Sequence, residues 1–241
     1  MAIDSYLYSS PGGREYNEDC VGERVISGGK LFVAADGLGG HKYGDIASKC
    51  VVDTFKAAAE PEEDVRQWLE DTIAEAHNAV MKLQDEKAAK MRSTVAALAI
   101  KYNKAYWANV GDSRVYYIHN DTIYAITEDH SVAYKKFLLG EITRDEIATD
   151  EDQSSLLRTI GNESRNTPDI YESEEELSNG DAFLLCSDGA WEYFMDNEIL
   201  FDYFKSETAE QWAQYILTRI VSRVKEGNDN LSVITVIFNQ D

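Results

Sequence analysis

The sequence of 241 residues has few of the residues that mark several common protein classes. It has only three cysteines, Cys20, Cys50 and Cys186, which are widely spaced and form neither a CxxC motif nor a disulfide framework. It has three prolines and no Ser-, Gly- or Pro-rich tract that could serve as a linker. These absences predict one domain, residues 1–241, in a reducing cytoplasm.

Long apolar runs and basic residues are scarce as well. No run approaches the roughly 18 apolar residues of a membrane span, and the N-terminus lacks the basic and apolar regions of a signal peptide, so we expect no membrane span. Lys and Arg number 23 against 44 Asp and Glu, which gives a net charge of −21. This balance argues against nucleic acid or an anionic membrane as a partner. The acidic excess favours solubility, and part of it can bind cations.

What the sequence does contain is a regular succession of strand and helix patterns. Tight turns at Asn103 with Lys104 and at Asn120 with Asp121 indicate hairpins and therefore antiparallel sheet. The expected strands are 5–10, 21–27, 31–36, 93–101, 104–110, 114–119, 122–126, 167–172, 181–187 and 231–239, and the expected helices are 43–59, 62–91, 196–205 and 208–225. We therefore expect an α+β fold, a four-layer αββα sandwich of two packed antiparallel sheets flanked by helix pairs.

Two of the predicted strands end in nearly the same way. Residues 31–37 read LFVAADG and residues 183–189 read FLLCSDG, so each apolar run stops at an Asp-Gly pair. Since Gly indicates a sharp turn, Asp36 and Asp188 should each project from the end of a rigid strand. Hard oxygen ligands held in this way suit Mg²⁺ or Mn²⁺. Cys186, inside the second run, is expected to be a buried small hydrophobe.

These Asp-Gly pairs belong to a series of seven short motifs. In order, the motifs are Arg14-Glu-Tyr-Asn-Glu18-Asp19, Asp36-Gly37-Leu-Gly39-Gly40-His41, Ser93-Thr94, Gly111-Asp112-Ser113-Arg114, Leu157-Arg158-Thr-Ile-Gly161, Ser187-Asp188-Gly189 with Trp191, and Asp229-Asn230. Each motif alone is weak, because Asp-Gly occurs at ordinary turns. Together, over essentially the whole chain, they resemble the PPM, or type-2C, family of metal-dependent Ser/Thr protein phosphatases. The Asp-Gly-Leu-Gly-Gly-His wording is most similar to the stand-alone bacterial branch of that family.

The resemblance implies a centre of two Mn²⁺ or Mg²⁺ ions. Asp36 is the implied bridging ligand, and the carbonyl of Gly37 is a plausible second contact. Asp188 and Asp229 are implied as ligands of the first ion and Glu18 of the second. Carboxylates this close would repel one another without metal. A water bridging two such ions supplies hydroxide near neutral pH, which would attack phosphorus in line.

Four further residues have expected roles around this centre. Asp19 would act mainly through metal-bound water. Arg14 is the candidate cation for the phosphate, because its planar fork matches two phosphoryl oxygens. Asp112 has two interpretations, a ligand of a third and weaker ion or the cap of a turn between strands. Arg114 is expected to be structural and to pair with an acid.

One position departs from the pattern, and one segment has no clear period. Some relatives carry a His directly after the Asp-Gly as a proposed general acid, but here that residue is Leu38. Either metal-bound water or another group then supplies the proton, and His41 is a weak candidate.

Residues 129–157 are crowded with charge and predict an irregular or short-helical flap beside the site, which would influence substrate choice and product release.

Other phosphatase classes fit the sequence poorly. Cysteine-dependent phosphatases need an Arg six residues after the Cys, where this chain has Ile26, Lys56 and Glu192. Aspartyl-phosphate phosphatases need an Asp-x-Asp after an apolar strand, and the nearest match, at residues 150–152, lies in a polar stretch. Calcineurin-like enzymes use His-rich motifs, and the chain has four His.

We therefore expect a monomeric enzyme that acts on phosphoserine and phosphothreonine in protein substrates of a Ser/Thr kinase. Two alternatives stay open. One is a catalytically inactive PPM-fold protein that serves as a binding or scaffold module. The other is a metal-dependent hydrolase of a different phosphoester.

Overall fold

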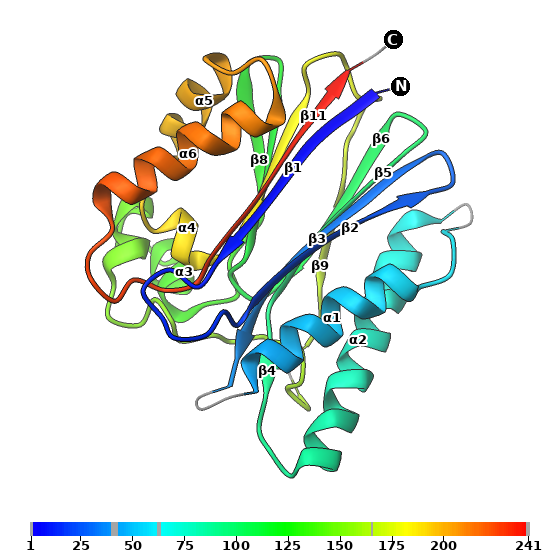
Figure 1. The fold of residues 1–241 in the computed structure, drawn as a ribbon, viewed down its shortest axis with the longest axis vertical. Helices are drawn as coiled ribbons and strands as arrows, with labels where there is room; N and C mark the ends of the chain where they lie inside the picture. Colours follow the sequence, from blue (N-terminus) through cyan, green and yellow to red (C-terminus); the bar gives the residue numbers. More distant parts are fainter. Residues whose placement is uncertain (1, 40–42, 62–63, 165, 240–241) are drawn as a thin grey trace.

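The computed structural model describes residues 2–39, 43–61, 64–164 and 166–239, and its strands form two antiparallel sheets packed face to face (Figure 1). The first sheet has the order β1 (Ala2–Ser10), β11 (Leu231–Asn239), β10 (Ala182–Cys186), β7 (Arg114–His119) and β8 (Thr122–Ile126). The second has the order β2 (Asp19–Ile26), β3 (Gly29–Leu38), β5 (Val95–Lys101), β6 (Lys104–Val110) and β9 (Asp169–Glu172), and the short β4 (Arg92–Ser93) pairs with β3.

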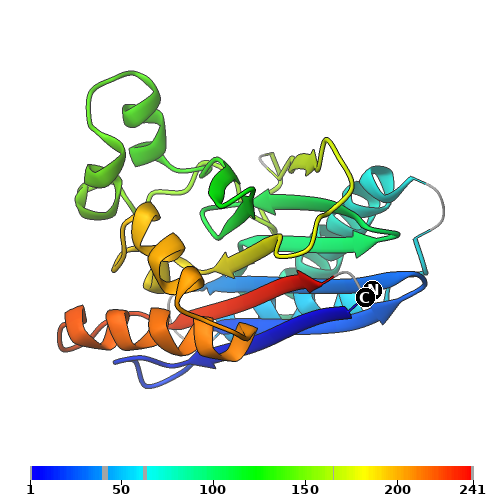
Figure 2. The ribbon, with the colours of Figure 1, turned by 90° about the horizontal axis from the view of Figure 1, so that it is seen from above.

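Helices cover both outer faces of the paired sheets (Figures 1 and 2). The helices α1 (Gly44–Ala57) and α2 (Val65–Lys87) pack on the second sheet, whereas α5 (Asp196–Phe204) and α6 (Ala209–Arg223) pack on the first. The predicted α+β fold with four layers is therefore confirmed. In the part of the chain that the structure describes, every helix is too short or too polar to cross a membrane.

The central strands are apolar throughout because both of their faces are buried. In β3, Leu31, Val33 and Ala35 pack toward α1 and α2, while Phe32 and Ala34 alternate with them and pack between the two sheets. All five side chains are essentially inaccessible to solvent. Full burial of a large apolar side chain contributes about 1.5–3 kcal/mol, so these strands form a rigid frame.

Some element boundaries differ from the sequence prediction. The helix α2 ends at Lys87 because Ala88 adopts a left-handed conformation with φ of 48°, and the first two residues predicted for this helix, 62 and 63, lie outside the described residues. The first hairpin turn is formed by Tyr102 and Asn103, one residue earlier than predicted, with φ values of 50° and 62°. The turn at Asn120 and Asp121 lies where it was predicted.

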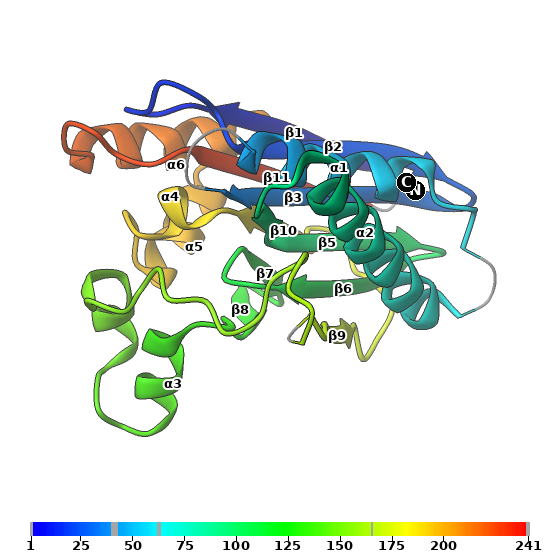
Figure 3. The same cartoon turned by 90° about the horizontal axis from the view of Figure 1, so that it is seen from below.

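Residues 129–157 form an excursion that leaves the sheets and returns to nearly the same point. They contain α3 (Val132–Leu138) and the 3₁₀ helix η1 (Arg144–Thr149), and they project from the body of the molecule (Figure 3). The two ends are tied together, because the Leu157 N–H donates to the His130 carbonyl over 2.7 Å and the Val132 N–H donates to the Ser155 carbonyl over 2.9 Å. This agrees with the short-helical segment that the sequence predicted.

Candidate metal centre

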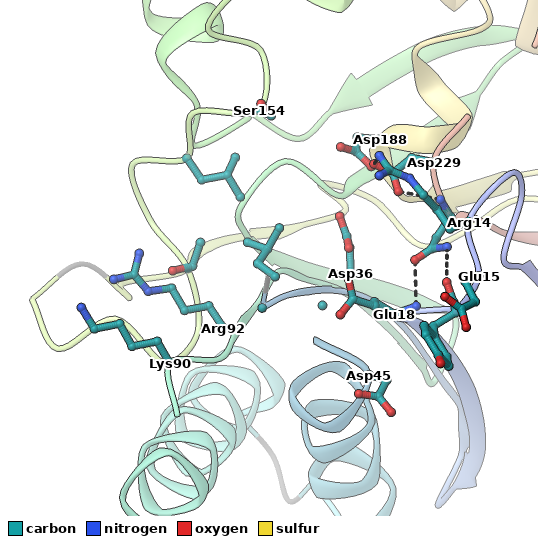
Figure 4. A pocket seen from close by; sticks show the side chains of 17 residues that line it. Arg14, Glu15, Glu18, Asp36, Asp45, Lys90, Arg92, Ser154, Asp188 and Asp229 are labelled. Atoms are coloured by element: carbon teal, nitrogen blue, oxygen red, sulfur yellow. Dashed lines mark hydrogen bonds and ion pairs between the residues drawn. The ribbon is translucent and has the colours of Figure 1, made fainter. Parts of the chain in front are cut away.

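Acidic side chains from both sheets meet in one cleft of about 1180 Å³ (Figure 4). Asp36 lies near the end of β3, and Asp188 begins the short helix α4 (Asp188–Trp191) directly after β10. Glu18 immediately precedes β2, and Asp229 lies two residues before the start of β11. With Arg14 and Gly37, which also line the cleft, six of the eight predicted site residues come together here.

The other two predicted residues, Asp19 and Asp112, are buried and do not line the cleft. Their exposed fractions are 7% and 3%. Asp19 lies opposite Asp36 in the pairing of β2 with β3 and accepts a hydrogen bond of 2.7 Å from the Ser187 hydroxyl. One oxygen of Asp19 and one of Asp112 have no hydrogen-bond partner among the described residues. An unpaired buried carboxylate oxygen costs free energy, and a cation would satisfy it.

The electrostatics of these acids also favour a cation. Burial, followed by the charges of Asp188 and Asp19, raises the pKa of Asp36 well above its ordinary value. Burial and the charge of Asp112 do the same to the pKa of Asp188. Burial raises the pKa of Asp19 to about 6 and that of Asp112 to about 7. The acids are therefore close enough to repel one another, and divalent ions would relieve this repulsion.

The side chains do not yet surround an ion position. Among the described residues, no three His, Cys, Asp or Glu side chains are arranged to hold a metal as they stand. Asp229 instead accepts a hydrogen bond of 2.9 Å from Arg14, and both side chains are about half exposed. An exposed ion pair contributes only about 0–1 kcal/mol, so it can separate readily. The oxygen donors fit Mg²⁺ or Mn²⁺ in kind, and their carboxylates must close around the ions.

The Ser93-Thr94 motif fixes the backbone that carries Asp36. The Asp36 N–H donates to the Thr94 hydroxyl over 2.9 Å, and the Thr94 N–H donates to the Asp36 carbonyl over 2.8 Å. The Ser93 hydroxyl donates to the same carbonyl over 3.0 Å. Thr94 in turn shares a hydrogen bond of 2.7 Å with the Ser113 hydroxyl. The end of β3 is thus held by hydrogen bonds from the neighbouring segment. This explains why the strand is interrupted at Thr94, between β4 and β5.

Gly37 allows the start of α1 to approach this strand end. A Cβ atom at Gly37 would lie 2.0 Å from the Gly44 carbonyl oxygen, so no other residue fits without displacement of the backbone. The Gly44 N–H donates to a carboxylate oxygen of Glu18 over 3.1 Å. Burial raises the pKa of Glu18 and this hydrogen bond opposes the shift. Glu18 is therefore held at the N-terminal end of a helix, a contact that favours its charged form but is outweighed by burial.

Asn230 organises the loop that carries Arg14 and Glu18, a role that the sequence did not reveal. Its side-chain oxygen accepts the Glu18 N–H over 2.8 Å, and its side-chain nitrogen donates to the carbonyls of Pro11 and Tyr16 over 2.9 and 2.8 Å. Asn suits this position because one amide both donates and accepts. The only signal in the sequence was its place directly after Asp229.

Arg114 is structural, as predicted. Its guanidinium group forms two hydrogen bonds of 2.8 and 2.6 Å with Asp129, and the Trp191 ring lies 3.7 Å from it. The Trp191 indole N–H donates to the Asp112 carbonyl over 2.9 Å. These contacts link the segment after β10 to the turn that carries Asp112.

Glu192 is a further acid that the sequence analysis did not single out. Burial raises its pKa to about 7, and it accepts a short hydrogen bond from Gln153 of the 129–157 segment. Its charge also raises the pKa of Asp188. Glu192 therefore connects this segment to the acids of the cleft.

Comparison with known proteins agrees with this site. A model of the protein phosphatase 2C family matches residues 13–222, and the chain belongs to this family. The serine/threonine phosphatase stp of Listeria innocua serovar 6a is 30% identical over 217 residues, which cover 87% of this chain and 84% of that protein. The predicted resemblance is therefore confirmed.

Solved structures show the same fold. Serine/threonine phosphatase Stp1 from Staphylococcus aureus superposes with a TM-score of 0.88 at 28% identity and covers 100% of this chain and 96% of its own. The catalytic domain of the serine threonine protein phosphatase PstP, solved in complex with two manganese ions, has a TM-score of 0.83 at 24% identity and covers 99% of each chain. The second likeness supports the fold alone.

Proposed function

We propose that this protein, a serine/threonine phosphatase of the 2C type, hydrolyses phosphoserine and phosphothreonine in proteins with two divalent ions held in the acidic cleft. The observation that carries this proposal is the convergence of Glu18, Asp36, Asp188 and Asp229 from both sheets into one cleft. Burial and mutual repulsion of these acids and those behind them favour cation binding.

Each acid has a proposed place around the ions. Asp36 would bridge them, Asp188 and Asp229 would hold the first ion, and Glu18 would hold the second together with the Gly37 carbonyl. Asp19, which is buried behind Asp36, would act through water. Asp112 would belong to a third and weaker site, in accordance with its unpaired buried oxygen.

The chain's own residues bind and orient the phosphate. When bound, two divalent ions would supply a hydroxide near neutral pH and offset the negative charge on the phosphoryl oxygens. Arg14 lines the cleft with its side chain about half exposed and would separate from Asp229 to direct its guanidinium fork at two phosphoryl oxygens. Asn230 would keep the Arg14 loop in register with Glu18 during this change.

The leaving alkoxide needs a proton, and we propose that water in the cleft supplies it. The described residues that line the cleft include no His, and Leu38 occupies the position where some relatives have one. His41, the weaker candidate, lies outside the described residues.

We further propose that residues 1–241 act as one catalytic domain and that residues 129–157 act as its flap. Ser154 and Leu156 of this segment line the cleft, and Gln153 contacts Glu192. A substrate that enters the cleft would therefore touch the segment. Its projection from the body leaves it free to adapt to the substrate (Figure 3).

The direct test is phosphate release from a phosphothreonine peptide and a phosphoserine peptide. Protein treated with a chelator should release none, and added Mn²⁺ or Mg²⁺ should restore the activity. Full turnover in chelator would exclude the two-ion mechanism. A metal-loaded protein that binds these peptides without cleaving them would favour the inactive binding module. Cleavage of small phosphoesters alone would favour a different substrate class.

A further inference from the structure

The cleft of the metal centre has charges of opposite sign on its two sides. The acids and Arg14 lie on one side of Asp36, and Lys90 and Arg92 lie on the other (Figure 4). Lys90 and Arg92 come from the segment between α2 and β5, far in sequence from the acidic motifs. The proposed mechanism gives neither cation a task, although both line the same cleft as Asp36.

Both cations are exposed and available. Neither side chain forms a hydrogen bond or an ion pair with any residue in the described ranges, whereas Arg14, Arg114 and Arg158 each pair with an Asp. The protein has 44 acidic and 23 basic residues, so potential acidic partners are abundant. Two cations that face a cleft without a protein partner can take an anion from solution.

The backbone that carries these cations is fixed. Met91, between them, is fully buried against the helix layer, and its carbonyl accepts a hydrogen bond of 2.6 Å from the Gln84 side chain. Arg92 lies directly opposite Leu38 in the pairing of β4 with β3, and Leu38 is two residues beyond Asp36 in β3. The next residue exchanges two backbone hydrogen bonds with Ile160, of 3.1 and 2.8 Å. The backbone of Arg92 therefore keeps a constant position relative to the strand that carries Asp36, while its side chain is free to reach a ligand.

Thr159 is a second and independent sign of a ligand in this part of the cleft. It lies next to Ile160, which pairs with Ser93, and it also lines the cleft. The residue is 2% exposed, and its hydroxyl has no hydrogen-bond partner among the described residues. A buried hydroxyl without a partner is uncommon, and a bound polar group or its ordered water would satisfy it.

We propose that Lys90 and Arg92 form a subsite for an anionic side chain that lies near the phosphoserine or phosphothreonine to be cleaved. This subsite rests on the proposed phosphatase function of the cleft. Its ligand is a carboxylate or a second phosphate of the same substrate segment. In a protein with a net charge of −21, an acidic substrate segment is repelled over most of the surface, so local cations decide whether it docks.

The test compares phosphothreonine peptides that differ at one position. Glu, Gln or phosphoserine is placed in turn at each of three positions on either side of the phosphothreonine, and kcat/KM for dephosphorylation of the phosphothreonine, resolved by mass spectrometry, is measured with the Mn²⁺-loaded protein. At one position or more, Glu or phosphoserine should exceed Gln by about fivefold, mostly through KM. Preference for Glu identifies a carboxylate ligand, and preference for phosphoserine alone identifies a second phosphate.

Variants of the two cations separate this subsite from general charge effects. Lys90→Gln with Arg92→Gln should abolish the preference, and Lys90→Glu with Arg92→Glu should reverse it toward peptides that carry Lys. Lys205→Gln removes an exposed cation that does not line the cleft and should retain the preference. Both cations are exposed, so these variants should fold, which a thermal melt checks.

Each contrary result has a distinct meaning. If all peptides are cleaved equally well by the unmodified protein, or if the preference survives both double variants, the subsite is wrong and the phosphatase function stands. If the metal-loaded protein cleaves neither the peptides nor an aryl phosphate, the proposed function is wrong and the subsite falls with it.

Discussion

At the scale of single residues, the acids of the cleft favour cation binding at the expense of stability. Asp36 and Asp188 lie at the ends of buried strands, where each carboxylate loses hydration and meets the charge of its neighbours. Asp19 and Asp112 each retain an oxygen without a partner among the described residues. Without metal, such an arrangement is strained electrostatically, so removal of one charge should help folding and harm catalysis.

Asp188→Asn tests this trade-off. The variant keeps the shape of the side chain but removes one of the repelling charges, so the melting temperature in chelator should rise by a few degrees. Turnover of a phosphopeptide with Mn²⁺ should fall by a factor of about 10² or more, because a proposed ligand of the first ion is lost. The two measurements are a thermal melt in chelator and steady-state phosphate release.

Asp202→Asn is the matched control. Asp202 is an acid outside the cleft that is 3% exposed, and it pairs with Arg219 through hydrogen bonds of 2.9 and 2.7 Å. Its substitution should lower the melting temperature, because it leaves a partly buried cation without its partner, and it should change turnover little. Equal turnover in Asp188→Asn and the unmodified protein would show that Asp188 is not a ligand.

The raised pKa values also predict how stability depends on pH. The pKa values of Asp19, Asp112 and Glu192 rise from 3.8, 3.8 and 4.5 to about 6, 7 and 7 on folding. A carboxyl with a raised pKa holds its proton more tightly in the folded state. Its stabilising contribution is complete below the unfolded pKa and is lost as the pH rises through the folded pKa.

In chelator, the protein should therefore melt at a higher temperature near about pH 5 than near about pH 7.5. Glu198, whose pKa is lowered to about 2 chiefly by its hydrogen bond from Arg223, stays ionised across this window, and the pKa values of His77 and His130, which burial lowers, oppose the trend but are outnumbered by the three carboxyls. With saturating Mn²⁺ the difference should shrink or reverse, because the ions favour the ionised carboxylates. A higher melting temperature at the higher pH in chelator would contradict the proposed repulsion.

At the scale of secondary-structure elements, rigid strands hold the acids, and the segment of residues 129–157, whose two ends are tied together, faces them. His130 joins the two parts. It is 5% exposed, its Nδ1 accepts the Gly111 N–H over 3.2 Å, and its Nε2 bonds Asp169 over 2.9 Å. Burial lowers its pKa, which favours the neutral ring, and because Nδ1 accepts a hydrogen bond the ring proton lies on Nε2 and is donated to Asp169. A buried imidazole thus contributes to holding the base of the proposed flap, together with the backbone hydrogen bonds between its two ends.

His130→Ala should loosen this segment without unfolding the sheets. Loss of the ring leaves the buried Gly111 N–H without its acceptor, at a cost of about 1–3 kcal/mol, and removes one hydrogen bond from Asp169, which keeps its ion pair with Arg158. Amide hydrogen exchange in residues 131–156 should accelerate about tenfold or more, and KM for a phosphopeptide should rise. Lys135→Ala, an exposed change within α3, is the control and should alter neither measurement. Unchanged exchange in His130→Ala would mean that the ring does not anchor the segment.

The elements show which features a sequence can reveal. The strands β3 and β10 were predictable because their apolar runs are buried on both faces and end at Asp-Gly. The short helix α4 was not predicted, because four residues after a strand carry no period that can be recognised. The sequence did not predict that the hairpin turn begins at Tyr102, since a Tyr with positive φ is not expected from composition.

The residues of the site also fall into those that the sequence could reveal and those that it could not. The motifs located the acids that line the cleft, because their residue types and order are distinctive. Asn230, Glu192 and Thr94 act through contacts with residues distant in sequence, such as the hydrogen bond from the Glu18 N–H to Asn230. Lys90 and Arg92 belong to no motif, and only the fold brings them to the same cleft as Asp36.

At the scale of the whole molecule, the two sheets form a single frame for one site. The second sheet supplies Asp19 and Asp36 through β2 and β3, and the first supplies Asp188 and Asp229 beside β10 and β11. Neither sheet alone could surround two cations. The packing of Phe32, Phe183 and other apolar side chains between the sheets therefore sets the spacing of the acids.

Anomalous X-ray scattering from a crystal soaked in Mn²⁺ tests this account most directly. We expect two strong peaks in the cleft, separated by about 3.5–4 Å, with Asp36 between them, Asp188 and Asp229 at one peak and Glu18 at the other. Asp229 should then no longer accept its hydrogen bond from Arg14. A cleft without peaks at saturating Mn²⁺, or peaks that do not contact Asp36, would contradict the proposed metal centre.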